Sequence, residues 1–99
     1  MFSFFDARSA KKFGAQMAQF YIAAMPLNMN LKEKQFAVKS LKTMEKMSLL
    51  IGSYKQQNKL NIYKVAQMGN AFKWALKDAA YEDDYVDKLT QWFVVTVKT

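Results

Sequence analysis

Helical periodicity constrains the fold of this 99-residue chain more than any other feature of its sequence. Apolar residues recur at three- and four-residue steps, the spacing of one helix face, and the first segment shows this at Phe13, Met17, Phe20, Tyr21 and Ala24. Only 1 proline and 3 glycines are present, too few for a turn-rich β-sheet protein. We therefore expect an all-α fold of about four amphipathic helices packed like a bundle. A single domain is expected, because two separate cores would have only about fifty residues each.

Capping residues and a helix breaker define the expected ends of the helices. The first helix should be capped by Ser3 and Asp6, and it should stop before Pro26 because a residue that precedes proline disfavours helical geometry. Asn61 should cap the third helix. The valine-rich segment 94–97 has strand character, so a strand-like end is the alternative to helix there. The expected helices cover residues 4–25, 31–57, 62–80 and 84–95.

The second and third segments each have one apolar face that is expected to enter the core. Within the third, Gly69 costs about 1 kcal/mol relative to alanine in a helix, so it predicts the close approach of a neighbouring helix or a bend. The expected core face of the second segment consists of Ala37, Leu41, Met44, Met47, Ser48 and Ile51. That of the third consists of Ile62, Val65, Ala66, Gly69, Phe72, Leu76 and Ala79.

Histidine and cysteine are both absent from the sequence. Their absence excludes thiol nucleophiles, Ser-His catalysis, haem and iron-sulfur centres, the usual zinc sites and disulfides. The acidic residues Glu82, Asp83, Asp84 and Asp87 lack the spacing and the glycine of a calcium loop, and they suit the start of the fourth helix, where the helix dipole favours negative charge. We therefore expect a protein that is not an enzyme and that holds no metal or cofactor.

The third segment also has a row of large aromatic residues opposite its apolar face. Aromatic side chains set among polar ones are enriched at protein interfaces, so this row predicts a partner interface, with a symmetric homodimer as the simplest case. The alternative is that the third helix is central in the fold and buried on both sides. The predicted interface residues are Tyr63, Gln67, Asn70, Trp74, Lys77 and Tyr81.

The chain is basic, with a formal net charge of +7, and Arg8 is its only arginine. Arginine is favoured for bidentate contacts to bases and phosphates, so a surface of lysines suits diffuse attraction to nucleic acid or another polyanion better than sequence-specific recognition. Four lysines fall within an arc of about 80° opposite the apolar face of the second helix, and they are either a solvated helix face or a polyanion-binding stripe. These lysines are Lys32, Lys39, Lys42 and Lys46.

Membrane association has little support in the sequence. No apolar stretch approaches the roughly eighteen residues needed to span a bilayer. Phe2, Phe4 and Phe5 could insert into a membrane surface beside the basic residues that follow, but packing over the end of the bundle is the favoured interpretation. The cytoplasm is the default compartment. The sequence as a whole predicts an adaptor or regulatory module that acts through protein contacts, including self-association, with polyanion binding as the alternative.

Overall fold

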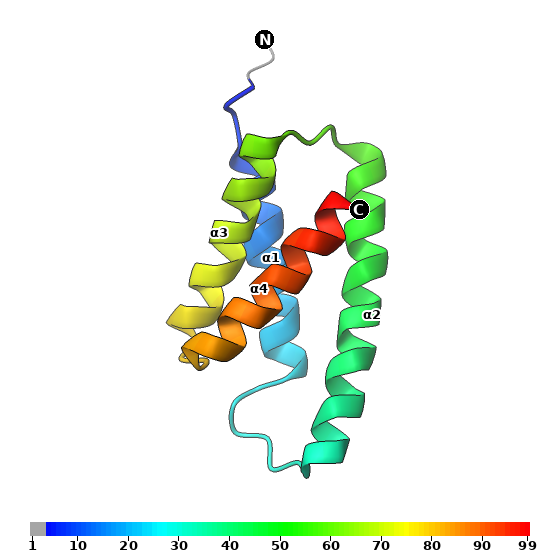
Figure 1. Ribbon diagram of the computed structural model, residues 1–99, viewed down its shortest axis with the longest axis vertical. Coiled ribbons are helices and arrows are strands. Elements are labelled where there is room, and N and C mark those ends of the chain that lie inside the picture. Colours follow the sequence, from blue (N-terminus) through cyan, green and yellow to red (C-terminus); the bar gives the residue numbers. More distant parts are fainter. Residues whose placement is uncertain (1–3) are drawn as a thin grey trace.

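The computed structural model describes residues 4–99, and four α-helices account for most of them (Figure 1). α1 covers Arg8–Ala24, α2 covers Glu33–Gln57, α3 covers Ile62–Asp78 and α4 covers Asp83–Lys98. The described residues include no strand. The expected all-α, bundle-like fold is thus confirmed, and the alternative of a strand-like end at residues 94–97 is wrong because α4 continues through that segment.

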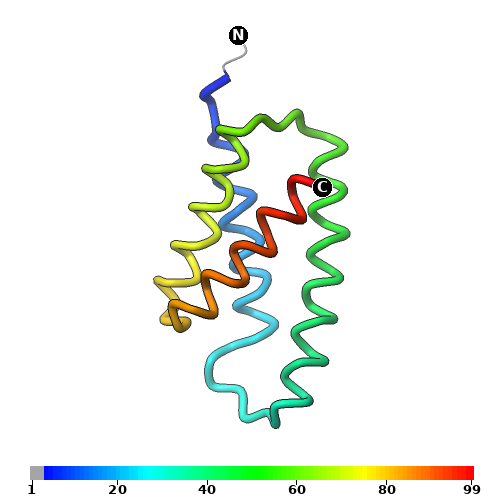
Figure 2. Tube along the Cα trace, in the orientation of Figure 1, coloured from blue at the N-terminus to red at the C-terminus, as the bar shows by residue number. Residues whose placement is uncertain are grey.

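Each helix packs against two others. α1 and α3 lie side by side in the most extensive contact, and α4 crosses obliquely to pack on α3 (Figures 1 and 2). α2, the longest helix at 25 residues, stands at the edge of the molecule and contacts α1 and α4 less extensively (Figure 2). α2 and α3 are therefore on opposite sides of the bundle, and each has a side that no other helix covers.

Two glycines allow the closest helix contacts. A Cβ atom built on Gly14 of α1 would lie 2.2 Å from the carbonyl oxygen of Met68 in α3, far inside van der Waals contact. α1 and α3 can approach this closely only because glycine has no side chain. A Cβ atom on Gly69 would lie 2.8 Å from Cγ2 of Val94 in α4. This contact confirms the close helix approach predicted at Gly69.

The core is formed by the inward sides of all four helices and contains stacked aromatic rings. Phe72 of α3 stacks on Phe93 of α4 with 4.3 Å between ring centroids, and neither side chain reaches solvent. Phe13 of α1 stacks on Tyr54 at 4.1 Å, which attaches the C-terminal part of α2 to the bundle. The largest fully buried side chains are Tyr21, Met25, Met47, Ile51, Met68, Phe72, Leu76, Val86 and Phe93.

Local hydrogen bonds mark the beginnings of α1 and α3. α1 begins at Arg8, later than predicted, because Asp6 remains outside the helix and accepts a hydrogen bond from the Arg8 backbone N–H at 3.3 Å. The side chain of Arg8 also binds this carboxylate, and these bonds lower the pKa of Asp6 from 3.8 to about 2. Ser3, the other predicted capping residue, lies outside the described residues. The predicted cap of α3 is confirmed, since Asn61 Oδ1 accepts the Lys64 backbone N–H at 2.8 Å.

The predicted core faces of α2 and α3 are confirmed in part, since Met47 and Ile51 of α2 and Phe72 and Leu76 of α3 are buried as expected. In α2, Leu41 is 62% exposed, whereas Thr43 is buried. In α3, Ile62 is 81% exposed, and Met68 is buried instead. The buried side of each helix is therefore shifted around the helix axis relative to the predicted one. The periodicity identifies an apolar side, but the neighbouring helices decide which part of that side is covered.

Candidate functional site

The aromatic row predicted on the third helix does not form one continuous surface. Tyr81 lies beyond the end of α3 and is only 7% exposed. The chain turns inward there, because α3 ends at Asp78 and Ala80 adopts a φ of 72°. The other five predicted residues lie on the side of α3 that faces away from the core, namely Tyr63, Gln67, Asn70, Trp74 and Lys77.

Tyr81 belongs to a buried cluster of tyrosines instead. Its hydroxyl donates a hydrogen bond to the carbonyl oxygen of Met25, and its ring stacks on Tyr85 with 6.1 Å between centroids. The hydroxyl of Tyr21 contacts those of Tyr85 and Ser40. Burial raises the pKa of both Tyr21 and Tyr81 above the usual 10.0. Tyr81 therefore closes one end of the bundle, and its assignment to a partner interface is corrected.

The N-terminal segment covers part of the outward side of α3. The ring of Phe5 meets Tyr63 edge to face at 5.2 Å, and Asn61 Nδ2 donates a hydrogen bond to the carbonyl oxygen of Phe4 at 3.1 Å. Tyr63 is half-buried as a result, while Phe4 and Phe5 themselves remain exposed. Phe2 lies outside the described residues. The predicted packing of these phenylalanines over the bundle thus takes the form of a contact with the start of α3.

Trp74 is the most exposed aromatic residue of the outward side of α3, with 56% of its surface accessible. The ammonium groups of Lys73 and Lys77 lie 5.8 and 5.3 Å from its ring centroid, within the range of a cation–π contact. Lys77 also approaches Asp83 of α4 at 3.8 Å. The prediction of a central third helix covered on both sides does not hold at Trp74, where the ring is open to solvent.

A second exposed apolar surface lies on α2, and the sequence analysis did not identify it. Val38, Leu41 and Leu49 are 47%, 62% and 77% exposed, and together with Glu45 they form a row with helical spacing on the side remote from the core. We call this row the outer face of α2. The sequence does not indicate this row, because the helical spacing places Leu41 on the expected core face.

Three of the four lysines predicted to form a stripe lie around one depression in the structure. Lys32, Lys39 and Lys42 line a shallow depression of about 640 Å³ beside Val38, and Lys34 joins them. No carboxylate is present among the described residues that line this depression. Lys46 is one turn further along α2 and does not take part. Lys34 is not among the predicted lysines because its helical position falls outside the predicted arc. We call Lys32, Lys34, Lys39 and Lys42 the lysine cluster.

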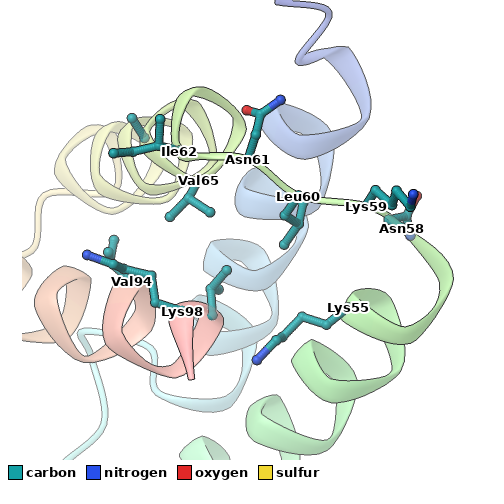
Figure 3. Close-up of a pocket in the computed structure, with 11 residues that line it drawn as sticks. Lys55, Asn58, Lys59, Leu60, Asn61, Ile62, Val65, Val94 and Lys98 are labelled. Atoms are coloured by element: carbon teal, nitrogen blue, oxygen red, sulfur yellow. The ribbon is translucent and has the colours of Figure 1, made fainter. Parts of the chain in front are cut away.

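An open groove of about 710 Å³ lies near the connection between α2 and α3 (Figure 3). Four parts of the chain meet there: the last turn of α2, the α2–α3 connection, the first turns of α3 and the last turns of α4. Aliphatic side chains form the floor, and lysines and asparagines form the rim. The lining consists of Lys55, Asn58, Lys59, Leu60, Asn61, Ile62, Val65, Ala66, Val94, Val97 and Lys98.

All the charged side chains that line the groove are positive. Lys55 lies at the end of α2, Lys59 in the connection and Lys98 at the end of α4, and the described lining residues include no carboxylate. Figure 3 shows Val65 and Leu60 pointing into the space between the helices, with Lys55 reaching toward the end of α4. This arrangement can accept an apolar group that carries negative charge at its edges. Sequence reasoning did not find it, because residues 58–62 meet the rest of the lining only in the folded chain.

Neither a membrane helix nor a cation site adds to these surfaces. Within residues 4–99, no helix is long and apolar enough to cross a membrane. In the same part of the chain, no three carboxylates converge as metal ligands would, and this includes the acidic residues at the start of α4.

Comparisons with family models, with curated proteins and with solved structures find no match to this chain.

Proposed function

We propose that this protein is a non-enzymatic interaction module that self-associates through the outer face of α2. One observation carries the proposal, which is the exposure of Val38, Leu41 and Leu49 in a single row. Large apolar side chains that are exposed close together on one face are typical of protein contact sites, although here Glu45 lies between Leu41 and Leu49. α2 is also the helix with the least extensive packing in the bundle, so a second helix has room to lie against it.

The residues of this row are spaced symmetrically, which favours a second copy of the chain as the partner. Val38, Leu41, Glu45, Leu49 and Gly52 follow one another at steps of 3, 4, 4 and 3 residues. Two copies of α2, packed antiparallel about a twofold axis at Glu45, would place Leu41 of each copy against Leu49 of the other. Val38 would lie opposite Gly52, around which the structure leaves open space.

Charge at the centre of this contact opposes the association in part. The two Glu45 carboxylates would meet near the twofold axis, and like charges at short distance destabilise a contact. Lys42 and Lys46 flank Glu45 in each copy and supply positive charge close to it. Glu45 therefore offers a way to strengthen the dimer, because its replacement by leucine removes the repulsion and extends the apolar row.

The first test is the oligomeric state in solution. We expect sedimentation velocity between about 10 and about 500 μM to show a reversible dimer, because one helix face buries less than the roughly 800 Å² per partner of a standard interface. Leu49→Glu should weaken association at least about tenfold, since it places two charges in the contact. Glu45→Leu should tighten association.

Variants on α3 provide the matched control for this test. Trp74→Ala removes the most exposed aromatic residue of the predicted α3 interface and should leave the dimer unchanged. Circular dichroism should show that each variant keeps its helix content. A wild-type chain that stays monomeric at the highest concentration would overturn the proposal. Loss of the dimer in Trp74→Ala, but not in Leu49→Glu, would move the interface to α3.

Polyanion binding is the second candidate function, and the lysine cluster is the observation that favours it. Four lysines surround one depression without a carboxylate in its lining, so an extended phosphate chain would meet positive charge over more than two turns of α2. The binding would be diffuse, because lysine ammonium groups act as point charges and do not read base edges.

Salt-dependent binding to a heparin column tests this second candidate. We expect the wild-type chain to be retained at low salt and the double variant Lys39→Gln/Lys42→Gln to elute at clearly lower salt, because each lost phosphate contact reduces the salt dependence of binding. Lys11→Gln/Lys12→Gln removes the same charge from α1 and serves as the control. Equal retention of the two double variants would show that net charge alone is responsible and would reject a defined site.

A further inference from the structure

We infer that the groove between the α2–α3 connection and the end of α4 is a docking site for an acidic amphipathic helix of a partner protein. This inference goes beyond the proposed self-association, because the groove lies at the end of the bundle and shares no lining residue with the outer face of α2. It assigns a function to a surface that dimerisation through α2 would leave open.

The floor of the groove fits the apolar side of a helix. Val97 is buried at its base, and Leu60, Val65 and Val94 are half-buried around it. Ile62 stands at the edge and, at 81% exposed, is the most accessible of the large apolar residues described. A helix that binds a groove inserts large side chains at three- and four-residue steps, and aliphatic walls on several sides are what such side chains require.

The rim determines the charge of the partner. Lys55, Lys59 and Lys98 are distributed around the apolar floor, so carboxylates on the flanks of a bound helix would meet a lysine at the edges of the groove. Charged rims of this kind act mainly on association rate and on the choice of partner. An apolar helix with basic flanks would be repelled. The charge complementarity therefore selects acidic amphipathic segments among all helical ones.

Within residues 4–99, no surface segment combines exposed apolar side chains with acids on both flanks. The acidic residues at the start of α4 are exposed, but Val86 and Leu89, the apolar residues next to them, are buried in the core. The exposed apolar row of α2 contains Glu45 but is flanked by Lys42 and Lys46, which the lysines of the groove would repel. A second copy could therefore bring acidic residues or apolar side chains to the groove, but not both on one segment. The occupant that satisfies both the floor and the rim is a different protein.

Nucleic acid and small amphiphiles fit the groove less well. Stacking of bases requires aromatic side chains, and the lining residues include no aromatic ring among those the structure describes. Sites for small molecules bury most of the ligand, whereas this groove is open to solvent along one side. A helix uses an open groove fully, because its polar side remains in water.

A peptide selection tests the inference. The probe is a displayed library of random peptides of about 16 residues, selected on the wild-type chain, with removal of peptides that also bind the Ile62→Asp variant. Ile62 is suitable because its exposure means that the substitution does not disturb the core. We expect the selected peptides to combine apolar residues at helical spacing with Asp or Glu on both flanks. Selected peptides without acidic residues would overturn the inference.

Affinity measurements on synthetic versions of the selected peptides complete the test. Ile62→Asp, and separately the triple variant Lys55→Glu/Lys59→Glu/Lys98→Glu, should each weaken binding at least about tenfold. A peptide with its acids changed to lysine should bind the triple variant better than the wild type. Leu49→Glu should bind like the wild type, which separates failure at the groove from failure of self-association. Equal binding to Ile62→Asp, or displacement of the peptides by a fluorescent fatty acid, would overturn the inference.

Discussion

Phe72→Ala is expected to lower the free energy of unfolding by about 3–5 kcal/mol, the typical cost of truncating a buried phenylalanine. Phe72 is fully buried and stacks on Phe93 with 4.3 Å between centroids, so the substitution removes both the apolar burial and the ring contact that joins α3 to α4. A chain of this size has a total stability of roughly 5–15 kcal/mol, and the variant would therefore lose a large fraction of it.

Urea unfolding followed by circular dichroism measures this loss. Trp74→Ala is the matched control, since it truncates a larger aromatic residue on the exposed side of the same helix and should change stability by only about 0.5 kcal/mol. A loss below about 1 kcal/mol for Phe72→Ala would contradict the core described here. Equal losses in the two variants would show that α3 turns a different side to the bundle.

Gly14→Ala should destabilise the protein by about 2 kcal/mol, although alanine is the better helix former. The added Cβ would lie 2.2 Å from the carbonyl oxygen of Met68, which is a backbone atom that cannot rotate away. α1 and α3 would have to separate, and overpacking of this kind costs up to about 3 kcal/mol. The gain in helix propensity of about 1 kcal/mol offsets only part of this cost.

Gly52→Ala provides the opposite result in the same protein. No atom lies within 4 Å of a Cβ built on Gly52, so only the helix propensity changes and stability should rise by about 1 kcal/mol. The two variants are compared by thermal or urea unfolding under identical conditions and at a concentration where the wild type is monomeric. A stabilising Gly14→Ala would mean that α1 and α3 do not approach as closely as the structure shows.

Local sequence signals predicted the helices well because each of them acts within one or two turns. Pro26 stops α1, Asn61 caps α3 by accepting the Lys64 N–H, and Gly69 marks the contact with α4. The end of α4 was less predictable. β-branched valines favour strands when considered alone, but Val97 continues the buried side of the helix one turn beyond Phe93, and this burial outweighs the local preference.

The rotation of the helices about their axes depends on neighbours that the sequence does not reveal. α2 has large apolar residues on more than one side, so its wheel is compatible with several orientations, and packing against α1 and α4 selects the one that exposes Leu41. Tyr81 was misplaced for a related reason. Tyr81 fits the helical spacing of α3, but the helix ends at Asp78 and the left-handed conformation of Ala80 changes the direction of the chain just before Tyr81.

The candidate surfaces differ in how far the sequence could reveal them. The lysine cluster lies on α2 and at its beginning, so helical spacing alone could predict that three of its lysines lie on one side. The groove draws Lys55, Val65 and Lys98 from three helices, and no spacing rule connects residues that meet only after the helices cross. An unusual signal was nevertheless present at Leu60 and Ile62, which are aliphatic residues at a connection where polar residues are the norm.

The sparse packing of α2 has a consequence for how the folded chain opens. A helix with limited burial against its neighbours is the segment that separates first from an otherwise folded protein, and its amide hydrogens then exchange with solvent without global unfolding. A second copy bound to the outer face of α2 would close this opening by mass action. If the chain dimerises as proposed, the protection of α2 amides from exchange should therefore rise with protein concentration.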